Sequence, residues 1–167
     1  MDIEPVAPEK ADTELQPLEQ GYLRVLRIEW AITMAVLLAI AAAVDLLVLR
    51  GNALPWGWLS GAVLLLSLWA VLTLPTRQFL TWGHSEEGDA LRVVHGYMFH
   101  TDTVVPFVRV QHIDVGQGPI ERLCGVSHLV VHTAGTHNSI VTLPGLDPVR
   151  AAEIRDSIRA RIQTDFA

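Results

Sequence analysis

Histidine is the residue type in this sequence with the widest capacity for chemistry, because imidazole can transfer protons and bind metal ions near neutral pH. The chain has seven histidines, and all of them follow residue 83. His128 and His132, on one strand, would lie about 13 Å apart at roughly 3.3 Å per residue. One zinc ion, with ligands at about 2.1 Å, cannot span that separation. His132 and His137 could meet across a turn, but no cysteine or carboxylate cluster accompanies them, so we expect no metal and no cofactor.

The residues needed for nucleophilic catalysis are also lacking in the sequence. The single cysteine, Cys124, lies in a Leu-Cys-Gly segment with no basic pair beside it to favour the thiolate. The sequence contains no G-x-S-x-G nucleophile elbow. We therefore predict that the chain is not an enzyme. A lone cysteine excludes an intramolecular disulfide and fits a reducing compartment.

Composition excludes two further classes. The chain has 12 Lys and Arg against 18 Asp and Glu, a net charge of −6, whereas nucleic-acid binders show a basic excess or stripe. We expect no nucleic-acid partner. Half of the residues are hydrophobic, 18% are charged and the mean hydropathy is +0.34. Such a chain is too apolar to be disordered over most of its length, and it suggests membrane segments.

Two nearly uncharged stretches, residues 30–49 and 54–74, are predicted to be membrane spans. The first contains Asp45 as its one charged residue, and the second contains none. At about 1.5 Å per residue, each covers the ~30 Å hydrocarbon core of a bilayer. The alternative is a pair of helices buried in a large soluble core, but too few residues follow to surround them. The short link from Arg50 to Ala53 makes the spans a tight antiparallel hairpin.

Arginines near the spans predict the topology. Arg24 and Arg27 precede the first span and Arg77 follows the second, whereas the connecting loop has Arg50 alone. By the positive-inside rule both termini are expected in the cytoplasm. A cleaved signal peptide is the competing interpretation, but the residues before the first span are numerous and acidic, whereas an n-region is short and basic.

Small and polar residues are expected to hold the hairpin together. Gly57 and Gly61 form a G-x-x-x-G pair in the second span. Asp45 lies about one turn from the loop, so it either reaches the interface or Arg50, or forms an inter-helix hydrogen bond with Ser60. The first span also carries a stripe of small residues, Ala35, Ala39 and Ala43.

The chain is expected to have three parts. Residues 1–16 are predicted to be a flexible acidic tail, residues 17–75 the membrane hairpin with a lead-in helix, and residues 76–167 a separate domain. In this domain short alternating runs between turn signals predict six or seven antiparallel strands. An amphipathic helix follows, with Asp147 as N-cap, Pro148 in its first turn and isoleucines on one face. A β-barrel or sandwich capped by a C-terminal helix matches the pleckstrin-homology (PH) superfold. The expected strand runs are 77–82, 91–100, 103–108, 110–115, 126–133 and 139–143.

The stretch VPFVRVQHIDVGQGPIER at residues 105–122 resembles the signature of the bacterial membrane-flanked PH-domain family. Residues 125–135 and 143–146 are also similar, as is the order of a short arm, two spans and a domain. The resemblance covers residues 18–162. It implies a PH-like fold in a multi-pass protein of the bacterial cytoplasmic (inner) membrane, without a defined biochemical activity. Family members commonly occur beside a longer relative, so it also implies assembly with that companion or with copies of itself.

We therefore expect a non-enzymatic, membrane-tethered interaction or scaffold subunit. The alternative interpretation of the signature is that it only maintains the fold. In that case Gly116 and Gly118 form a turn, and Arg122 pairs with Glu121 or Asp114. The candidate interaction residues are Arg109, Gln111, His112, Asp114, Gln117, Glu121 and Arg122.

The alternative function is sensing of a lipid or small ligand at the inner face of the membrane. PH domains that bind phosphoinositides use Lys and Arg on the first two strands and their connecting loop. Here the loop is expected at residues 84–89, where Glu86, Glu87 and Asp89 would repel a phosphate. Arg77 and Arg92 alone do not offset that repulsion. Phosphoinositide-type binding is therefore disfavoured, whereas an apolar or zwitterionic ligand stays open.

Overall fold

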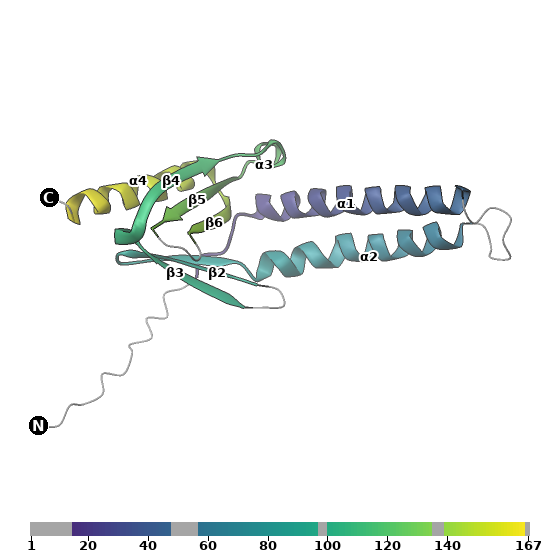
Figure 1. Cartoon of the computed structure of the whole chain (residues 1–167), viewed down its shortest axis with the longest axis horizontal. Helices are drawn as coiled ribbons and strands as arrows, with labels where there is room; N and C mark the ends of the chain where they lie inside the picture. Colours follow the sequence, from purple (N-terminus) through teal and green to yellow (C-terminus); the bar gives the residue numbers. More distant parts are fainter. Residues whose placement is uncertain (1–14, 48–56, 97–99, 135–138, 166–167) are drawn as a thin grey trace, which may run out of the picture.

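The computed structural model describes residues 15–47, 57–96, 100–134 and 139–165. Two long helices run side by side away from a body formed by the strands and the C-terminal helix (Figure 1). The body contains two three-stranded antiparallel sheets. This arrangement is the predicted one, a two-helix hairpin followed by a PH-like domain that ends in a helix.

The hairpin consists of α1 (Gln20–Leu47) and α2 (Trp58–Leu80). Both helices are long and apolar enough to cross a membrane, with mean hydropathies of 2.2 and 1.8 in their most apolar windows. Only 11% and 17% of those windows are buried within the protein. The outward apolar faces therefore need a non-aqueous surrounding, and the alternative of two helices in a soluble core is wrong.

The second helix extends further than the sequence predicted. Residues 77–82, expected as a strand, form the last turn of α2 and the segment after it, and Thr81 is the C-cap. Pro75 lies inside the helix and is buried. A proline inside a helix removes one backbone hydrogen bond, which membrane helices tolerate. Because α2 continues through Pro75, it carries Gln78 to the edge of the domain.

Small buried residues do line the contact between the two helices, but they are Ala41, Ser67 and Ala70. Gly61 is exposed, and a Cβ added there would meet nothing within 4 Å. Gly57 is the N-cap of α2 with a left-handed φ of 84°, so it serves the turn that begins the helix. The prediction that the G-x-x-x-G pair packs the hairpin is therefore wrong. The predicted small-residue stripe is also exposed: Ala35, Ala39 and Ala43.

Asp45 ties the end of α1 to the beginning of α2. It is 3% exposed, and its Oδ2 accepts a hydrogen bond of 2.8 Å from the backbone N–H of Ser60. The Ser60 hydroxyl lies 3.2 Å from the carbonyl of Gly57. The first N–H groups of a helix have no partner within the helix. The carboxylate of Asp45 satisfies one of them, which explains why a charged residue is kept here.

The domain has two sheets joined by a short 3-10 helix, η1 (Phe107–Arg109). Each sheet follows chain order, so its middle strand pairs with both neighbours. The first sheet consists of β1 (Gly83–Glu87), β2 (Ala90–His95) and β3 (Thr101–Pro106). The second consists of β4 (Val110–Gly116), β5 (Ser127–Thr133) and β6 (Ile140–Leu146). The helices of the domain are α3 (Pro119–Cys124) and α4 (Pro148–Asp165).

The predicted loop at residues 84–89 is mostly a strand. β1 pairs with β2 from Gly83 opposite Val94 to Glu87 opposite Ala90. Only Gly88 and Asp89 remain as the turn, and Gly88 has a φ of 51°. The loop prediction is wrong because the buried positions of β1 hold the polar residues His84 and Ser85, which the alternation pattern does not count as core.

The core lies between the two sheets and α4. Asp147 caps this helix as predicted, since its Oδ1 accepts a 2.8 Å hydrogen bond from the N–H of Val149. The apolar stripe of α4 closes the space over β4 and β5. The fully buried residues of this stripe are Ala151, Ile154 and Ile158.

The segment before α1 belongs to the domain. The backbone of Gln16 exchanges two hydrogen bonds with His84, of 2.8 and 3.1 Å. Leu18 is 4% exposed and is part of the domain core. Gln16 therefore belongs to the domain, and the predicted flexible tail of residues 1–16 is wrong at this residue. Residues 1–14 lie outside the described residues.

We expect the free energy of unfolding of the domain to fall as the pH drops below about 6.5, the usual pKa of histidine. Burial, and secondarily the charge of Arg150, lower the pKa of His84 in the folded domain. The unfolded chain therefore binds a proton that the folded chain resists. Stability is complete above the unfolded pKa and is lost between it and the lower folded pKa.

Denaturant unfolding of the full chain in detergent, from about pH 5 to pH 8, measures this dependence. The loss toward low pH should be smaller in His84→Gln. It should be unchanged in His100→Gln, because His100 is exposed. Identical pH dependence in all three proteins would contradict the role of His84.

Candidate functional site

The candidate interaction residues follow the path of η1, β4 and α3, and they divide into two groups. The side chains of Gln117 and Glu121 make contacts that hold the fold together. The others are exposed, as Gln117 also is: Arg109, Gln111, His112, Asp114 and Arg122. The contacts of Gln117 and Glu121 fit the fold-maintenance interpretation, and an interaction role for the exposed residues stays a prediction.

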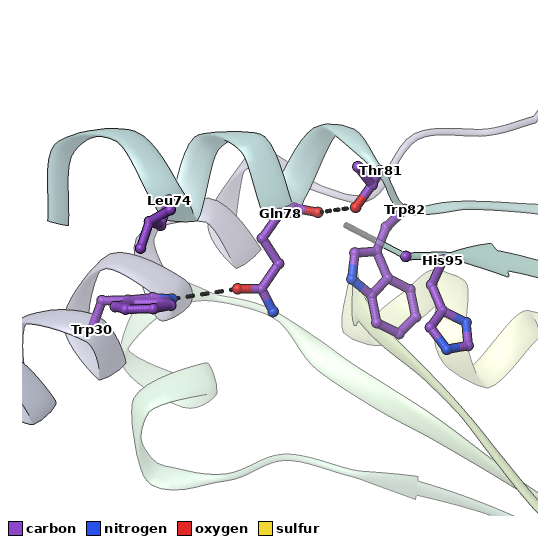
Figure 2. Close-up of a pocket in the computed structure, with 7 residues that line it drawn as sticks. Trp30, Leu74, Gln78, Thr81, Trp82 and His95 are labelled. Carbon is purple, nitrogen blue, oxygen red and sulfur yellow. Dashed lines mark hydrogen bonds between the residues drawn. The ribbon is translucent and has the colours of Figure 1, made fainter. Parts of the chain in front are cut away.

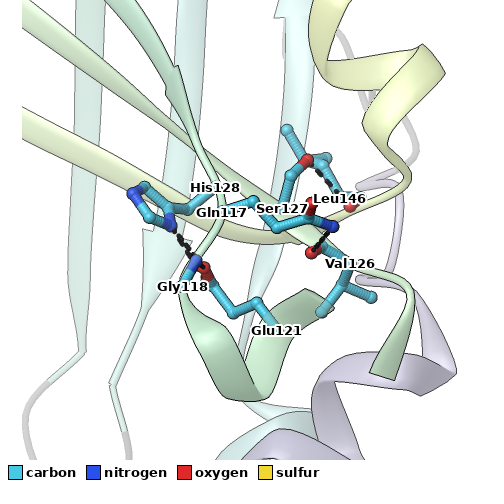
Figure 3. A network of polar contacts seen from close by, with 7 residues as sticks. All are labelled: Gln117, Gly118, Glu121, Val126, Ser127, His128 and Leu146. Atoms are coloured by element: carbon cyan, nitrogen blue, oxygen red, sulfur yellow. Dashed lines mark hydrogen bonds and ion pairs between the residues drawn. The ribbon is translucent and has the colours of Figure 1, made fainter. Parts of the chain in front are cut away.

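Glu121 is the centre of the fold-holding group (Figure 3). Its Oε2 accepts a 2.6 Å hydrogen bond from the backbone N–H of Gly118, which satisfies the beginning of α3. The same oxygen lies 2.7 Å from Nδ1 of His128 on β5. A carboxylate only accepts, so Nδ1 carries the donated proton. The Glu121 carboxylate thus contacts Gly118 and His128, and not Arg122 as the sequence predicted.

Gly116 makes room for this ion pair. A Cβ at Gly116 would collide with the ring of His128, which lies directly over it from the neighbouring strand. Gln117 adds a second link, because its Nε2 donates a 2.9 Å hydrogen bond to the carbonyl of Val126. These contacts fix the β4–α3–β5 connection as one rigid unit (Figure 3).

The sequence analysis did not predict α3. The signal was present, because Pro119 follows Gly118 and Glu121 stands three residues after Gly118, the spacing of a capping box. Gly125 ends the helix with a left-handed φ of 73°. The helix is only six residues long, too short for an apolar periodicity to reveal it.

This rigid unit packs against the beginning of α1. A Cβ added to Gly21 would lie 2.5 Å from Cγ1 of Val126 and 2.7 Å from the carbonyl oxygen of Cys124. Val25, one turn further along α1, is 2% exposed. On the other side Gly145, with a φ of 68°, lies against Tyr22. The signature segment thus helps to clamp the first membrane helix to the domain.

Apart from Arg122, which is on α3, the exposed group lies along the outer edge of the second sheet. A bulge between Val110 and His112 leaves Gln111 without an opposite residue on β5, so both Gln111 and His112 are exposed. Among the described strands, β4 pairs only with β5. Its other edge presents backbone groups of the kind to which a partner chain can bind.

A carboxylate joins two histidines on the outer face of this sheet. Asp114 Oδ1 lies 2.9 Å from Nε2 of His112, and its Oδ2 lies 3.6 Å from Nε2 of His132. The two rings are 5.9 Å apart. Among the described residues, no group of three or more His, Cys, Asp or Glu side chains is arranged to hold a metal ion. His137 lies outside the described residues.

A hollow of about 270 Å³ follows the edge of β4 where α4 passes it. Its wall is mixed, with an amide, an imidazole and a guanidinium beside aliphatic side chains. It is lined by Val110, Gln111, His112, Ile113, Arg159 and Ile162. This hollow places the exposed half of the signature next to a concave surface.

The acidic side chains expected to repel phosphate are partly engaged by α4. Arg150 Nη2 lies 3.1 Å from Oε1 of Glu86, and Arg161 Nη1 lies 3.9 Å from Oδ1 of Asp89. An exposed ion pair contributes about 0–1 kcal/mol to stability, but it reduces the local negative charge. Glu86 and Asp89 therefore do not form the unpaired acidic loop that the sequence predicted.

A second hollow lies where the membrane helices meet the domain (Figure 2). It has a volume of about 290 Å³ and is lined mainly by apolar surface. Trp30 Nε1 lies 3.4 Å from Oε1 of Gln78, and the rings of Trp82 and His95 stack at 4.7 Å. The sequence analysis missed this site, because its residues come from α1, α2 and β2.

The fold and these sites define a class of protein, a PH-like domain clamped onto a hairpin of two membrane helices. A family model described as "Bacterial PH domain" matches residues 23–162, so the chain belongs to this family. The chain is also similar to the UPF0699 transmembrane protein YdbS of Bacillus subtilis (strain 168). The two are 33% identical over 150 residues, which are 86% of this chain and 91% of the relative. No solved structure matches the chain.

Membership confirms the resemblance found in the sequence, and the chain is a membrane-associated PH-like protein. The match begins in the first turns of α1 and includes both membrane helices. The hairpin is therefore part of the family's architecture. Neither the family description nor the name of the relative assigns an enzymatic activity.

Proposed function

We propose that this chain is a non-enzymatic docking subunit that assembles with another PH-like membrane chain, either a longer relative or a second copy. The observation that carries the proposal is the division of the signature. Gln117 and Glu121 are used by the fold, whereas Arg109 at the end of η1 and Gln111 and His112 on β4 are exposed. The contacts that Gln117 and Glu121 make with the fold do not involve these exposed side chains, which leaves them available to a partner surface.

The chemistry of this edge suits a protein partner. The guanidinium of Arg109 offers planar donors, the amide of Gln111 both donates and accepts, and Asp114 only accepts. A surface with these donors and acceptors can form hydrogen-bonded contacts with a protein partner, which a purely apolar surface cannot. We name the exposed surface made by Arg109, Gln111, His112 and Asp114 the β4 edge. A partner held in the same membrane is confined near this edge, which favours association.

The proposal includes the orientation of the chain. Arg24, Arg27 and Arg77 lie at the domain end of the helices, which supports a domain and two termini on the cytoplasmic side of a bacterial inner membrane. With this orientation the β4 edge faces the cytoplasm and meets the cytoplasmic domain of a partner.

Site-specific photo-crosslinking in intact cells tests the proposal. A photoreactive amino acid at Gln111 of the full-length chain should form an adduct that contains peptides of a second PH-like membrane chain. The same residue at His100, which is exposed but lies outside the β4 edge, should form far less of it. Arg109→Glu should reduce the adduct at position 111, because it reverses a charge in the contact.

Two outcomes would reject the docking function. One is equal crosslinking from positions 111 and 100, and the other is crosslinking at position 111 only to proteins outside the family. The distinction between a longer relative and a second copy follows from the peptides in the adduct.

A further inference from the structure

The hollow at the junction continues into a groove between the membrane helices. The groove has a volume of about 450 Å³ and runs between α1 and α2 from Val44 and Leu59 to Trp30 and Leu74. The junction hollow begins at the same two residues, Trp30 and Leu74. The two hollows adjoin at these residues, and we call the pair the passage.

The groove is longer than one leaflet is thick, so it has room for an acyl chain of a membrane lipid. Along α1, Val44 and Trp30 are about 21 Å apart at 1.5 Å per residue, against roughly 15 Å for half of a hydrocarbon core. The groove is lined by aliphatic and aromatic side chains, and Leu37, Ile40 and Leu66 on its rim are exposed. In a bilayer such a rim faces acyl chains.

Two polar side chains, those of Gln78 and His95, lie at the domain end of the passage. The Gln78 amide oxygen faces Trp30, so its nitrogen keeps its donors for another group (Figure 2). Nδ1 of His95 is buried and has no hydrogen-bond partner within the described parts of the chain. These two side chains lie at opposite sides of the junction hollow. An ester or phosphate oxygen of a phospholipid would accept a hydrogen bond from the Gln78 amide.

A third hollow adds a negative charge beside this end. It is lined by Leu26, Glu29, Trp30, Thr33 and Gln78, and so shares Trp30 and Gln78 with the junction hollow. The Glu29 carboxylate therefore stands next to the position of a headgroup. A carboxylate attracts an ammonium group and repels an anionic headgroup.

From this arrangement we infer that the chain binds one phosphatidylethanolamine molecule. An acyl chain lies in the groove between α1 and α2, the phosphate region meets the Gln78 amide, and the ammonium group meets Glu29. This lipid site is independent of the proposed docking function, because it uses neither the β4 edge nor its residues. It also differs from phosphoinositide binding, which uses basic side chains on the first two strands.

Native mass spectrometry of the full-length chain in mild detergent tests the inference. The chain is exposed to an equimolar mixture of phosphatidylethanolamine and phosphatidylglycerol, and the retained lipid is counted. We expect one phosphatidylethanolamine per chain. Leu74→Trp should lose it, because the larger ring fills the passage. Leu72→Trp is the matched control, since Leu72 is 64% exposed on the same helix, and it should retain the lipid.

Two milder variants keep the test decisive if Leu74→Trp fails to fold. Gln78→Leu should reduce retention about fivefold, the effect of one neutral hydrogen bond. Glu29→Gln should remove the preference for phosphatidylethanolamine over phosphatidylglycerol, whereas Glu19→Gln, outside the hollow, should not. Equal retention of both lipids by the unmodified chain, or unchanged binding in Leu74→Trp and Gln78→Leu, would overturn the site.

Discussion

Replacing Gly21 with alanine is expected to loosen the membrane hairpin from the domain. The added methyl group would lie 2.5 Å from Val126 Cγ1 and 2.7 Å from the carbonyl oxygen of Cys124. The side chain can shift, but the carbonyl belongs to the end of α3 and moves only with that helix. Overpacking of this kind costs about 1–3 kcal/mol. Hydrogen exchange in the first turns of α1 and in β5 should become faster, and the melting temperature in detergent should fall.

Gly61→Ala is the matched control on the other helix. The position of its Cβ is open, and alanine is favoured over glycine in a helix by about 1 kcal/mol. This variant should melt at the same or a higher temperature. If both variants behaved alike, the close contact between α1 and α3 would not couple the hairpin to the domain.

The hairpin could be predicted from the sequence because its signal is one of composition. Two stretches of about twenty apolar residues have few possible structures, since each must bury or expose its whole surface. Details of the packing could not be obtained in this way. Ala41 and Ala39 look alike in the sequence, but only Ala41 faces α2, and the rotation of each helix depends on its partner.

Two predicted elements, the strand at residues 77–82 and the loop at residues 84–89, are wrong. In one a helix continues past a proline, and in the other polar residues are buried. β1 has the polar residues His84 and Ser85 at buried positions, so its sequence predicts a loop. α2 continues through Pro75 because α1 and the domain pack around it. In both cases tertiary contacts outweigh the local preference.

The fold divides the candidate interaction residues into two groups, and the sequence alone does not show this division. Gln117 and Gln111 are the same residue type six positions apart. Only the fold shows that the first bonds to the carbonyl of Val126 and that the second lies on a bulge. The junction hollow could not be predicted from the sequence either. Trp30, Gln78 and His95 come together only when α1 is clamped to the domain.

Phe107→Ala is expected to unfold the domain while the membrane hairpin stays helical. The Phe107 ring is 1% exposed between the two sheets, and its removal costs about 3–5 kcal/mol. That is a large part of the roughly 5–15 kcal/mol that stabilises a domain. The hairpin keeps its structure because each helix satisfies its own backbone hydrogen bonds in an apolar surrounding.

Circular dichroism during urea unfolding in detergent separates the two parts of this result. Phe107→Ala should lose most of the cooperative transition of the domain but keep the urea-resistant helical signal. Val108→Ala changes the next residue, which is 63% exposed, and should shift the midpoint only slightly. Loss of the helical signal together with the domain would mean that the hairpin depends on the domain for its own structure. Because Tyr22 in the first turn of α1 packs against the domain core, we expect only the first turns of this helix to fray.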